Sequence, residues 1–521
     1  MRDLFHDHGL VFLRDQELSL TDERAMGSIA EDTRWMDATE QAALVARGDV
    51  SAAELVDAAV ARIEATNEQL NAVAIEWFDT GDDAARAVPR GLPFGGVPTL
   101  LKDLSLHEAG RVLTNGNRVL RAAPPISSFD SELTLRFRQV GLVTLGRSTS
   151  SEMGSLPVTE TAAYGVTRNP WSHNYTPGGS SGGAAAAVAS GMVPVAHASD
   201  GGGSIRIPAS CCGLVGLKPS QGRVSMAPDR PESILPVEFV VTRSVRDTAA
   251  LLDAVAGPGI GDSVIAPAPS RPFADEVGAD PGRLRIGLLD HRPGGAPIHA
   301  DCVAAVTETA ARLEGLGHIV EPAWPSSLEA RSFDEQFFVL WATSRAVSLA
   351  RLGSMIGRAL TEDEVEGHNW AMAQFAKVLD AAAYAEALMA VSDFRRSTLS
   401  WWAGGYDLLL TPTLAQPPVR IGAMEPPADN PLQAMVYASD FTGFTGQFNL
   451  TGQPAISVPG CWNSAGLPIG VQLVADYGRE DVLLQVASQL ETAFPWNDLH
   501  PVETASPRLP ENEVAPGQLL V

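Results

Sequence analysis

Two clusters of glycine and serine, close together near the middle of the chain, constrain its structure most strongly. The first is Pro177–Gly183 (PGGSSGG) and the second is Asp200–Arg206 (DGGGSIR). Glycines on both sides of a serine let the backbone turn sharply and approach a ligand closely. The run Gly201–Gly203 can also aim successive N–H groups at one point, which is what a tetrahedral oxyanion requires. The second cluster therefore predicts an oxyanion hole beside Ser204.

The two clusters also allow other interpretations: a nucleotide-binding loop, a pair of tight turns or a nucleophile elbow. A nucleotide-binding loop is disfavoured, because neither cluster contains Gly-Lys-Ser/Thr or a G-x-G-x-x-G spacing. Ordinary tight turns remain open. In addition, Gly178–Gly182 has the G-x-S-x-G pattern of the α/β-hydrolase nucleophile elbow. That pattern makes Ser180 a candidate nucleophile of an esterase, with His368 or His500 as its base, but it leaves the second cluster and Lys102 unexplained.

Lysine is so rare in this chain that each one is informative. It occurs only at Lys102, Lys218 and Lys377. A guanidinium stays protonated in proteins, whereas a buried amine can lose its proton and act as a base. Lys102 follows the apolar stretch Val97–Leu101 and is therefore the candidate base for a serine nucleophile. Lys218 is the competing candidate base, but it follows the second cluster closely and better fits an anchor for that turn. Lys377 fits a helix surface.

The apolar pattern predicts alternating helices and strands. Ser51 and Glu54 form a capping box that opens a helix from Ala52 to Ala65. Further helices are expected at Gly183–Ser190, Cys302–Leu316 and Glu480–Leu490, and throughout the aromatic-rich block 328–402. Strands are expected at Val97–Leu101, Gly141–Leu145, Leu284–Leu289, His318–Glu321, Leu408–Leu410, Ala455–Val458 and Ile469–Val474. This alternation predicts an α/β fold with a large mixed, mostly parallel twisted sheet covered by helices on both faces.

We expect one main domain with two appended segments. Residues 1–37 form an N-terminal extension, 38–500 a single catalytic domain and 501–521 a C-terminal tail. Within the domain, residues 95–220 hold the core motifs, and block 328–402 is expected as an insertion on the substrate side.

The composition argues against several classes of function. The chain carries 62 acidic against 37 basic side chains, for a net charge of −25, and such a surface repels nucleic acid. The longest apolar stretch is short for a membrane span, and no signal-peptide pattern is present. The four cysteines show neither a disulfide pattern nor zinc spacing. We expect a cytoplasmic enzyme without a metal, a cofactor, a nucleic-acid partner or a membrane partner; a homodimer remains open.

Residues 176–220 closely resemble the signature of the amidase signature family. Their sequence is TPGGSSGGAAAAVASGMVPVAHASDGGGSIRIPASCCGLVGLKPS. The resemblance extends through residues 95–103 (GGVPTLLKD), 167–171 (TRNPW), 448–455 (FNLTGQPA) and 466–472 (GLPIGVQ), and it covers residues from about 38 to 495. It implies the amidase signature fold and a serine hydrolase that cleaves amide C–N bonds through an acyl-enzyme.

The resemblance also implies a Ser-cisSer-Lys catalytic triad. The family's nucleophile falls on Ser204, its cis-peptide serine on Ser180 and its lysine on Lys102. Lys102 would take a proton from Ser204 through Ser180. The oxyanion would be held by the N–H groups of Gly201, Gly202, Gly203 and Ser204.

Two positions depart from the usual family pattern. Ala198 stands where glycine is usual, and Gly201 stands where a bulkier residue is usual. The extra glycine puts the rigidity of the N–H array in doubt.

Within the family, the chain looks most similar to the 6-aminohexanoate cyclic-dimer hydrolase branch. The segments that carry this likeness are Ser244–Asp247, Thr361–Val365 and Ala475–Asp481. Most of these positions are expected to support the fold rather than to contact the substrate. They therefore indicate which relatives are similar more reliably than they indicate a substrate. The expected substrates are small linear or cyclic amides, aryl acylamides, carbamates or esters.

Aromatic side chains outside the signature are the expected substrate contacts, namely Phe441, Phe444, Trp401 and Trp402. Core packing is the competing explanation for each of them. The alternative function is that of the amidotransferase A subunit of tRNA-dependent glutamine formation, which shares the signature. The N-terminal extension and block 328–402 favour a self-contained hydrolase.

Overall fold

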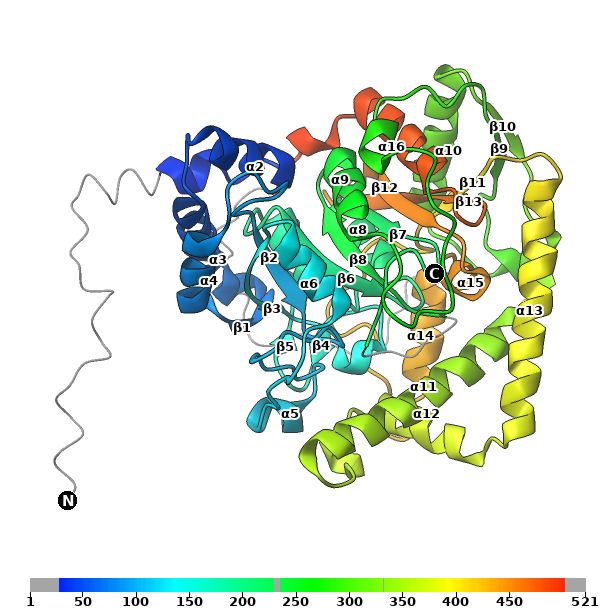
Figure 1. Ribbon diagram of the computed structural model, residues 1–521. Coiled ribbons are helices and arrows are strands. Elements are labelled where there is room, and N and C mark those ends of the chain that lie inside the picture. The colour runs from blue at the N-terminus through cyan, green and yellow to red at the C-terminus, as the bar shows by residue number, and fades with distance from the viewer. Residues whose placement is uncertain (1–27, 229–234, 331, 502–521) are drawn as a thin grey trace.

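A single large twisted sheet forms the centre of the molecule, with helices on both of its faces (Figure 1). The computed structural model describes residues 28–228, 235–330 and 332–501. The sheet has 11 strands in the order β1-β3-β2-β6-β8-β7-β12-β13-β11-β9-β10. The expected N-terminal extension and C-terminal tail lie largely outside the described residues.

The strands of the main sheet are β1 (Val73–Glu76), β2 (Pro98–Lys102), β3 (Val143–Ser148), β6 (Val195–Asp200), β7 (Val215–Lys218), β8 (Val237–Thr242), β9 (Arg285–Leu288), β10 (Ile319–Pro322), β11 (Leu408–Pro412), β12 (Ala455–Trp462) and β13 (Pro468–Ala475). A separate hairpin pairs β4 (Glu160–Thr161) with β5 (Gly165–Val166). The helices are α2 (Ala38–Arg47), α3 (Ala52–Leu70), α4 (Phe78–Ala87), α5 (Arg118–Ala122), α6 (Glu132–Gln139), α7 (Gly182–Ala189), α8 (Arg206–Cys212), α9 (Val245–Val255), α10 (Ala300–Gly315), α11 (Ser332–Ile356), α12 (Gly367–Val378), α13 (Ala381–Ala403), α14 (Gln433–Thr442), α15 (Gly446–Thr451) and α16 (Glu480–Ala493).

The expected mixed α/β sheet is confirmed. Parallel pairs lie on its two flanks, where β3, β2 and β6 run together and where β11, β9 and β10 run together. Antiparallel pairs fill the centre, from β6 through β8, β7, β12 and β13 to β11. Antiparallel pairing therefore takes a larger share than a mostly parallel sheet would have.

Small residues let one helix pack in the middle of the protein. All eight residues of α7 are buried, and they are glycine, alanine and valine. A helix that is apolar all round is typical of a fully buried position. Because α7 contacts β2, β3, β6 and α8, the loop before it is fixed against the sheet.

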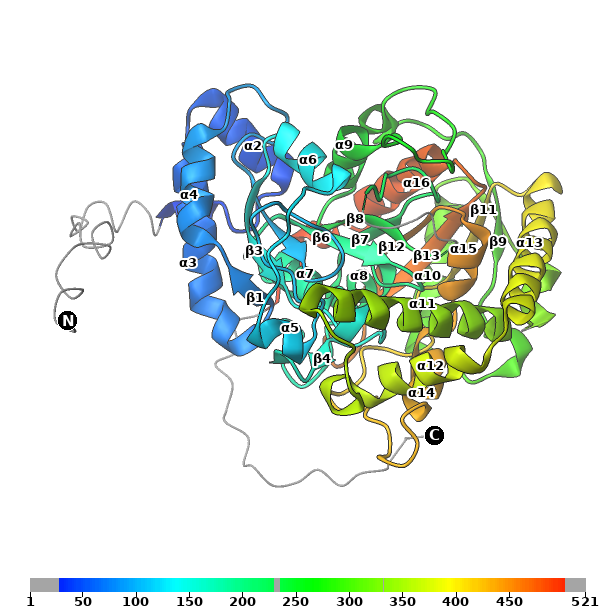
Figure 2. The same cartoon turned by 60° about the horizontal axis from the view of Figure 1, so that its bottom comes forward.

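The aromatic-rich block 328–402 folds into three long helices, α11, α12 and α13. In the view of Figure 2, α11 crosses in front of the sheet, with α12 beside it and α13 at one end. Its side chains, together with Ser180 and Ser204, line a cavity. The block therefore supplies part of the lining of this cavity.

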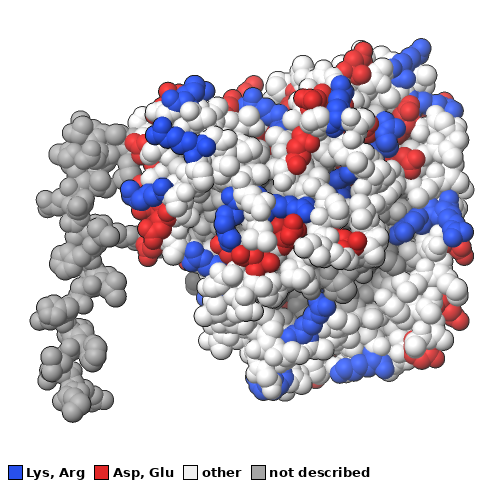
Figure 3. All heavy atoms as spheres, in the orientation of Figure 1, with Lys and Arg blue, Asp and Glu red and all other residues white. Residues whose placement is uncertain are grey.

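The surface carries charges of both signs. On the face shown in Figure 3, acidic and basic side chains are interspersed without an extended basic area. In the part of the chain that the structure describes, no helix is long and apolar enough to cross a membrane.

The predicted capping box at the start of α3 is present. Ser51 Oγ accepts the N–H of Glu54, and the Glu54 carboxylate accepts the N–H of Ser51 at 2.8 Å. Replacing Ser51 by Ala removes one of these bonds, so we expect the free energy of unfolding to fall by about 1 kcal/mol in urea denaturation. The exposed Gln69→Ala change in the same helix is the control and should shift it by less than about 0.5 kcal/mol. Equal losses in the two variants would contradict a specific role for the cap.

Candidate active site

The parallel pair β2 and β6 places two polar side chains at the same edge of the sheet. Lys102 is the last residue of β2, and Ser199 lies near the end of β6. Carboxyl ends of parallel strands meet at one edge, where α/β folds commonly build their sites. Lys102 is fully buried, and its Nζ donates a hydrogen bond to Ser199 Oγ at 2.9 Å.

Ser180 lies between this lysine and the cavity. Lys102 Nζ donates a hydrogen bond to Ser180 Oγ at 2.7 Å. The Gly179–Ser180 peptide is cis, as the family resemblance implied. A side chain at Gly179 would collide with the backbone of Val158 at 2.6 Å, so only glycine fits there. The first glycine-serine cluster thus presents Ser180 to the buried amine.

A buried ion pair shapes the loop that carries Ser204. Arg206 donates to the Asp200 carboxylate through Nε at 2.9 Å and through a terminal nitrogen at 3.0 Å, and both side chains are fully buried. Asn449 donates to the same carboxylate at 2.9 Å. The remaining guanidinium hydrogen bonds go to Thr445 O, Gln472 Oε1 and Asn449 Oδ1. Both charges are therefore compensated within the fold.

The surroundings of Asp200 stabilise the ionised form of its carboxyl group. Burial by itself would raise the pKa of this carboxyl, but the Arg206 guanidinium, Lys218 and Asn449 outweigh it and lower the pKa to about 2. The carboxylate is therefore ionised at neutral pH. It also accepts the N–H groups of Gly203 at 2.6 Å and Ile205 at 3.3 Å.

This arrangement corrects one expected oxyanion donor. The N–H of Gly203 points back to Asp200, so it is not available to a substrate. By contrast, the N–H groups of Gly202 and Ser204 donate to no acceptor among the described residues. The sequence pattern could not reveal this difference, because it depends on which way each peptide faces.

Two aromatic rings of α11 pack directly on the glycine run. A Cβ added to Gly201 would lie 3.0 Å from the Trp341 ring, and one added to Gly202 would lie 2.9 Å from the Phe337 ring. Gly203 has a φ of 135°, which glycine alone adopts readily. The additional glycine at 201 therefore makes room for an indole. The two rings pack against the loop and restrict its movement. Packing therefore supplies the rigidity that the additional glycine at position 201 had put in doubt.

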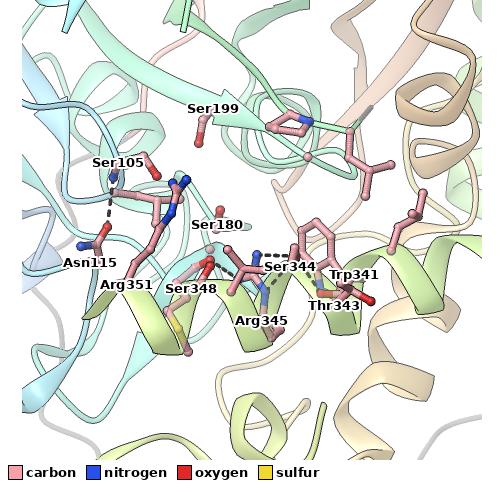
Figure 4. A pocket seen from close by; sticks show the side chains of 18 of the residues that line it. Ser105, Asn115, Ser180, Ser199, Trp341, Thr343, Ser344, Arg345, Ser348 and Arg351 are labelled. Atoms are coloured by element: carbon pink, nitrogen blue, oxygen red, sulfur yellow. Dashed lines mark hydrogen bonds between the residues drawn. The ribbon is translucent and has the colours of Figure 1, made fainter. Parts of the chain in front are cut away.

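Ser204 lies where two cavities meet. A cavity of about 500 Å³ is lined by Ser180, Ser199, Ser204 and the α11 residues that face them (Figure 4). We call it the serine-side cavity. A second cavity of about 560 Å³ is lined by Ser204, Gly202 and aromatic residues of α11. We call it the ring-side cavity. Both are large enough for a small molecule.

The four aromatic residues expected to contact substrate do not line either cavity. Phe441 and Phe444 are fully buried in the core, and Trp402 is buried as well. Trp401 packs on Tyr406 with ring centroids 4.1 Å apart. These rings pack in the core: Trp401 and Trp402 come from α13, Phe441 from α14 and Phe444 from the segment after α14. The cavity-lining aromatic residues of the described chain that sequence reasoning missed are Phe333, Phe337, Phe338, Trp341 and Tyr384.

The structure does not support the alternative in which Ser180 is an α/β-hydrolase nucleophile with His368 or His500 as its base. His368 Nε2 makes a hydrogen bond with Ser155 Oγ at 2.8 Å, and His500 stacks on Trp35. The Ser180 hydroxyl accepts a hydrogen bond from Lys102 rather than from a histidine. Lys218 is buried and donates to the Pro219 carbonyl at 3.0 Å, which fits its expected anchoring role.

Comparison with known proteins gives the same family. The sequence profile of the amidase family, described as "Amidase", matches residues 54–484. A 6-aminohexanoate-cyclic-dimer hydrolase from Paenarthrobacter ureafaciens is 42% identical over 472 residues, which cover 89% of this chain and 95% of that protein. The structure of a 6-aminohexanoate cyclic dimer hydrolase matches with a TM-score of 0.87 and 41% identity, covering 90% of this chain and 99% of that one. A bacterial aryl acylamidase of the amidase signature family matches with a TM-score of 0.80 and 27% identity, covering 90% and 98%.

The chain therefore belongs to the amidase family, as its signature predicted. It is a serine amidohydrolase, a hydrolase acting on carbon–nitrogen bonds other than peptide bonds. Among the described residues, no group of three His, Cys, Asp or Glu side chains is arranged to hold a metal ion.

Replacing Asp200 by Asn tests the ion pair beneath Ser204. The change keeps the shape of the side chain but leaves the buried Arg206 without its counter-charge. We expect the free energy of unfolding to fall by about 3–5 kcal/mol in urea denaturation, together with a loss of amide hydrolysis. The control is Asp49→Asn, which breaks an exposed pair with Arg47 and should cost less than about 1 kcal/mol. A cost for Asp200→Asn as small as that of the control would contradict this account.

Proposed function

We propose that Ser204 is the nucleophile of this amidohydrolase, Ser180 the proton relay and Lys102 the base. The observation that carries the proposal is the 2.7 Å hydrogen bond from Lys102 Nζ to Ser180 Oγ, in a cavity that Ser204 also lines. A serine hydroxyl is a weak nucleophile unless a nearby base removes its proton. Lys102 and Ser180 supply that base and a path to it.

The reaction proceeds in two steps. In the first, neutral Lys102 takes the proton of Ser204 through Ser180 as Ser204 Oγ bonds to the carbonyl carbon. The same relay returns the proton to the leaving nitrogen as the C–N bond breaks, which leaves an ester on Ser204. In the second step, water attacks this ester and the relay runs again, releasing the acid and restoring the free serine.

The oxyanion is held by the N–H groups of Gly202 and Ser204 in this proposal, with Gly201 as a further candidate donor. Fixed donors aimed at the developing charge are worth roughly 2.7–4 kcal/mol each. Ser199 takes part indirectly, because its hydroxyl accepts from Lys102 Nζ and helps hold the amine toward Ser180. His197 accepts the backbone N–H of Lys102 and is bonded on its other side to Glu238.

The proposed substrates are small linear or cyclic amides, aryl acylamides and carbamates. Two of the relatives support this class, since one is named for a cyclic amide dimer and one for aryl acylamides. The size of the two cavities supports it as well, because each accommodates a group of several carbon atoms rather than a macromolecule.

Substitution of each triad residue tests the assignment. Ser204→Ala should lower kcat for an anilide substrate by about 10⁴-fold or more and abolish covalent labelling by a fluorophosphonate, followed by mass spectrometry. Ser180→Ala and Lys102→Ala should lower kcat by at least about 10²-fold. The exposed Ser400→Ala is the matched control and should leave turnover unchanged. Labelling that survives in Ser204→Ala and disappears in Ser180→Ala would overturn the assignment.

A second experiment separates a self-contained hydrolase from the amidotransferase subunit. The purified chain should release amine from a simple amide such as an acyl anilide without ATP and without any added protein. Release should be measured by absorbance of the free aniline, with Ser204→Ala as the blank. Activity that appears only with an added partner protein or with ATP would favour the amidotransferase role.

A further inference from the structure

The two cavities share the nucleophile but not the proton relay. Ser204, Gly154 and Trp341 line both cavities, whereas Ser180 and Ser199 line only the serine-side cavity. The relay thus reaches a bound substrate from one side of Ser204. The two sides of the site are therefore chemically different, although they are similar in volume.

Trp341 lies at the boundary of the two cavities, since it lines both of them. Its ring stacks on Phe337, with centroids 5.4 Å apart, and the Arg345 guanidinium lies 4.8 Å from its ring centroid. A Cβ added to Gly201 would lie 3.0 Å from the ring, so the ring leaves no room for a side chain there. Only 8% of the residue is exposed. A ring held on three sides is a fixed partition rather than a mobile side chain.

We propose that the serine-side cavity receives the amine half of the substrate, that the ring-side cavity receives the acyl half, and that Trp341 keeps them apart. This inference rests on the proposed triad. It assigns a different half of the amide to each cavity, and therefore predicts which residues select which half.

The direction of proton transfer carries the assignment. When the C–N bond breaks, the leaving nitrogen must gain the proton that Ser204 lost, so that R–CO–NH–R′ and the serine hydroxyl give the acyl-serine and H₂N–R′. Ser180 delivers that proton, and a proton donor must lie within hydrogen-bond reach of its acceptor. Because Ser180 faces only the serine-side cavity, the nitrogen and its substituent must lie there. The acyl substituent then occupies the other side of Ser204.

The linings of the two cavities suit these two halves. The ring-side cavity gathers the aromatic side chains Phe333, Phe337 and Phe338 beside Leu432 and Met435, which suits an aryl or alkyl acyl group. Its lining also includes the charged residues Arg292, Asp334 and Asp440. The serine-side cavity is also largely apolar, with Leu104, Met153 and Leu340 in its lining, and α11 adds the polar side chains of Thr343, Ser344 and Ser348 (Figure 4). Such a lining suits an amine half with an alkyl or aryl body and a hydrogen-bonding group.

Two matched substitutions test the assignment by filling one cavity at a time. Ser348→Phe narrows the serine-side cavity and Leu432→Trp narrows the ring-side cavity; both positions are half-buried and belong to only one lining. Two substrate series are needed: anilides of one amine with acyl chains of increasing length, and amides of one short acid with amines of increasing size. Acylation and deacylation rate constants should be measured separately by stopped-flow kinetics.

We expect Ser348→Phe to lower kcat/KM for bulky amines by about tenfold or more while leaving the acyl-length profile and the deacylation rate constant unchanged. Leu432→Trp should instead shift the preference toward shorter acyl chains and alter deacylation, because only the acyl half remains bound in that step. The reverse pattern, or equal sensitivity of both variants to both series, would overturn the assignment.

Two further variants keep the test informative if the bulky side chains prevent folding. Ser348→Ala and Leu432→Ala enlarge the same cavities and should extend the range of accepted amines and acyl chains, respectively. Trp341→Ala should remove the partition between the two cavities. The kcat/KM values of the acyl series should then depend on the size of the amine, and those of the amine series on the acyl chain. A failure of the proposed triad itself would show differently, as turnover that persists in Ser204→Ala.

Discussion

The ion pair between Asp200 and Arg206 is the interaction on which the active site depends. It joins the end of β6 to the first turn of α8, and Ser204 lies in the loop between them. Asn449 and Gln472 extend the network to α15 and β13, which come from the far end of the chain. A buried charge pair is tolerated only when every donor and acceptor is satisfied. That requirement fixes the positions of several segments relative to one another. The loop that carries Ser204 is held in place because it connects two of them.

The fold could be predicted from the sequence where periodicity was strong. The helix after Ser51, the strand ending at Lys102 and the strands near the C-terminus were all found within a few residues. Strands β6, β7 and β8 were not predicted, and β6 ends directly at the glycine run. The three strands are antiparallel neighbours. β6 and β7 are short and lie beside glycine-containing turns, which hide their pattern.

Chemistry dictates the residue types of the proposed triad, whereas packing decides which aromatic side chains line the cavities. A rare lysine after a buried strand and a serine after three glycines pointed to Lys102 and Ser204. The substrate-side aromatic residues were misassigned, because a sequence does not show which face of a helix meets the cavity: Trp402 lies in the core, whereas Trp341 faces Ser204. Gly203 was likewise indistinguishable from its neighbours, since only the structure shows its N–H turned toward Asp200.

The scarcity of lysine has a practical consequence. Lys102 and Lys218 are fully buried, whereas Lys377 is exposed near the end of α12. Reagents that couple to side-chain amines therefore meet one accessible lysine among the described residues. Attachment through Lys377 would fix the protein to a bead or an electrode in one orientation, at a position outside both linings. The sparing use of lysine that singles out the proposed base thus also leaves one exposed side-chain amine among the described residues.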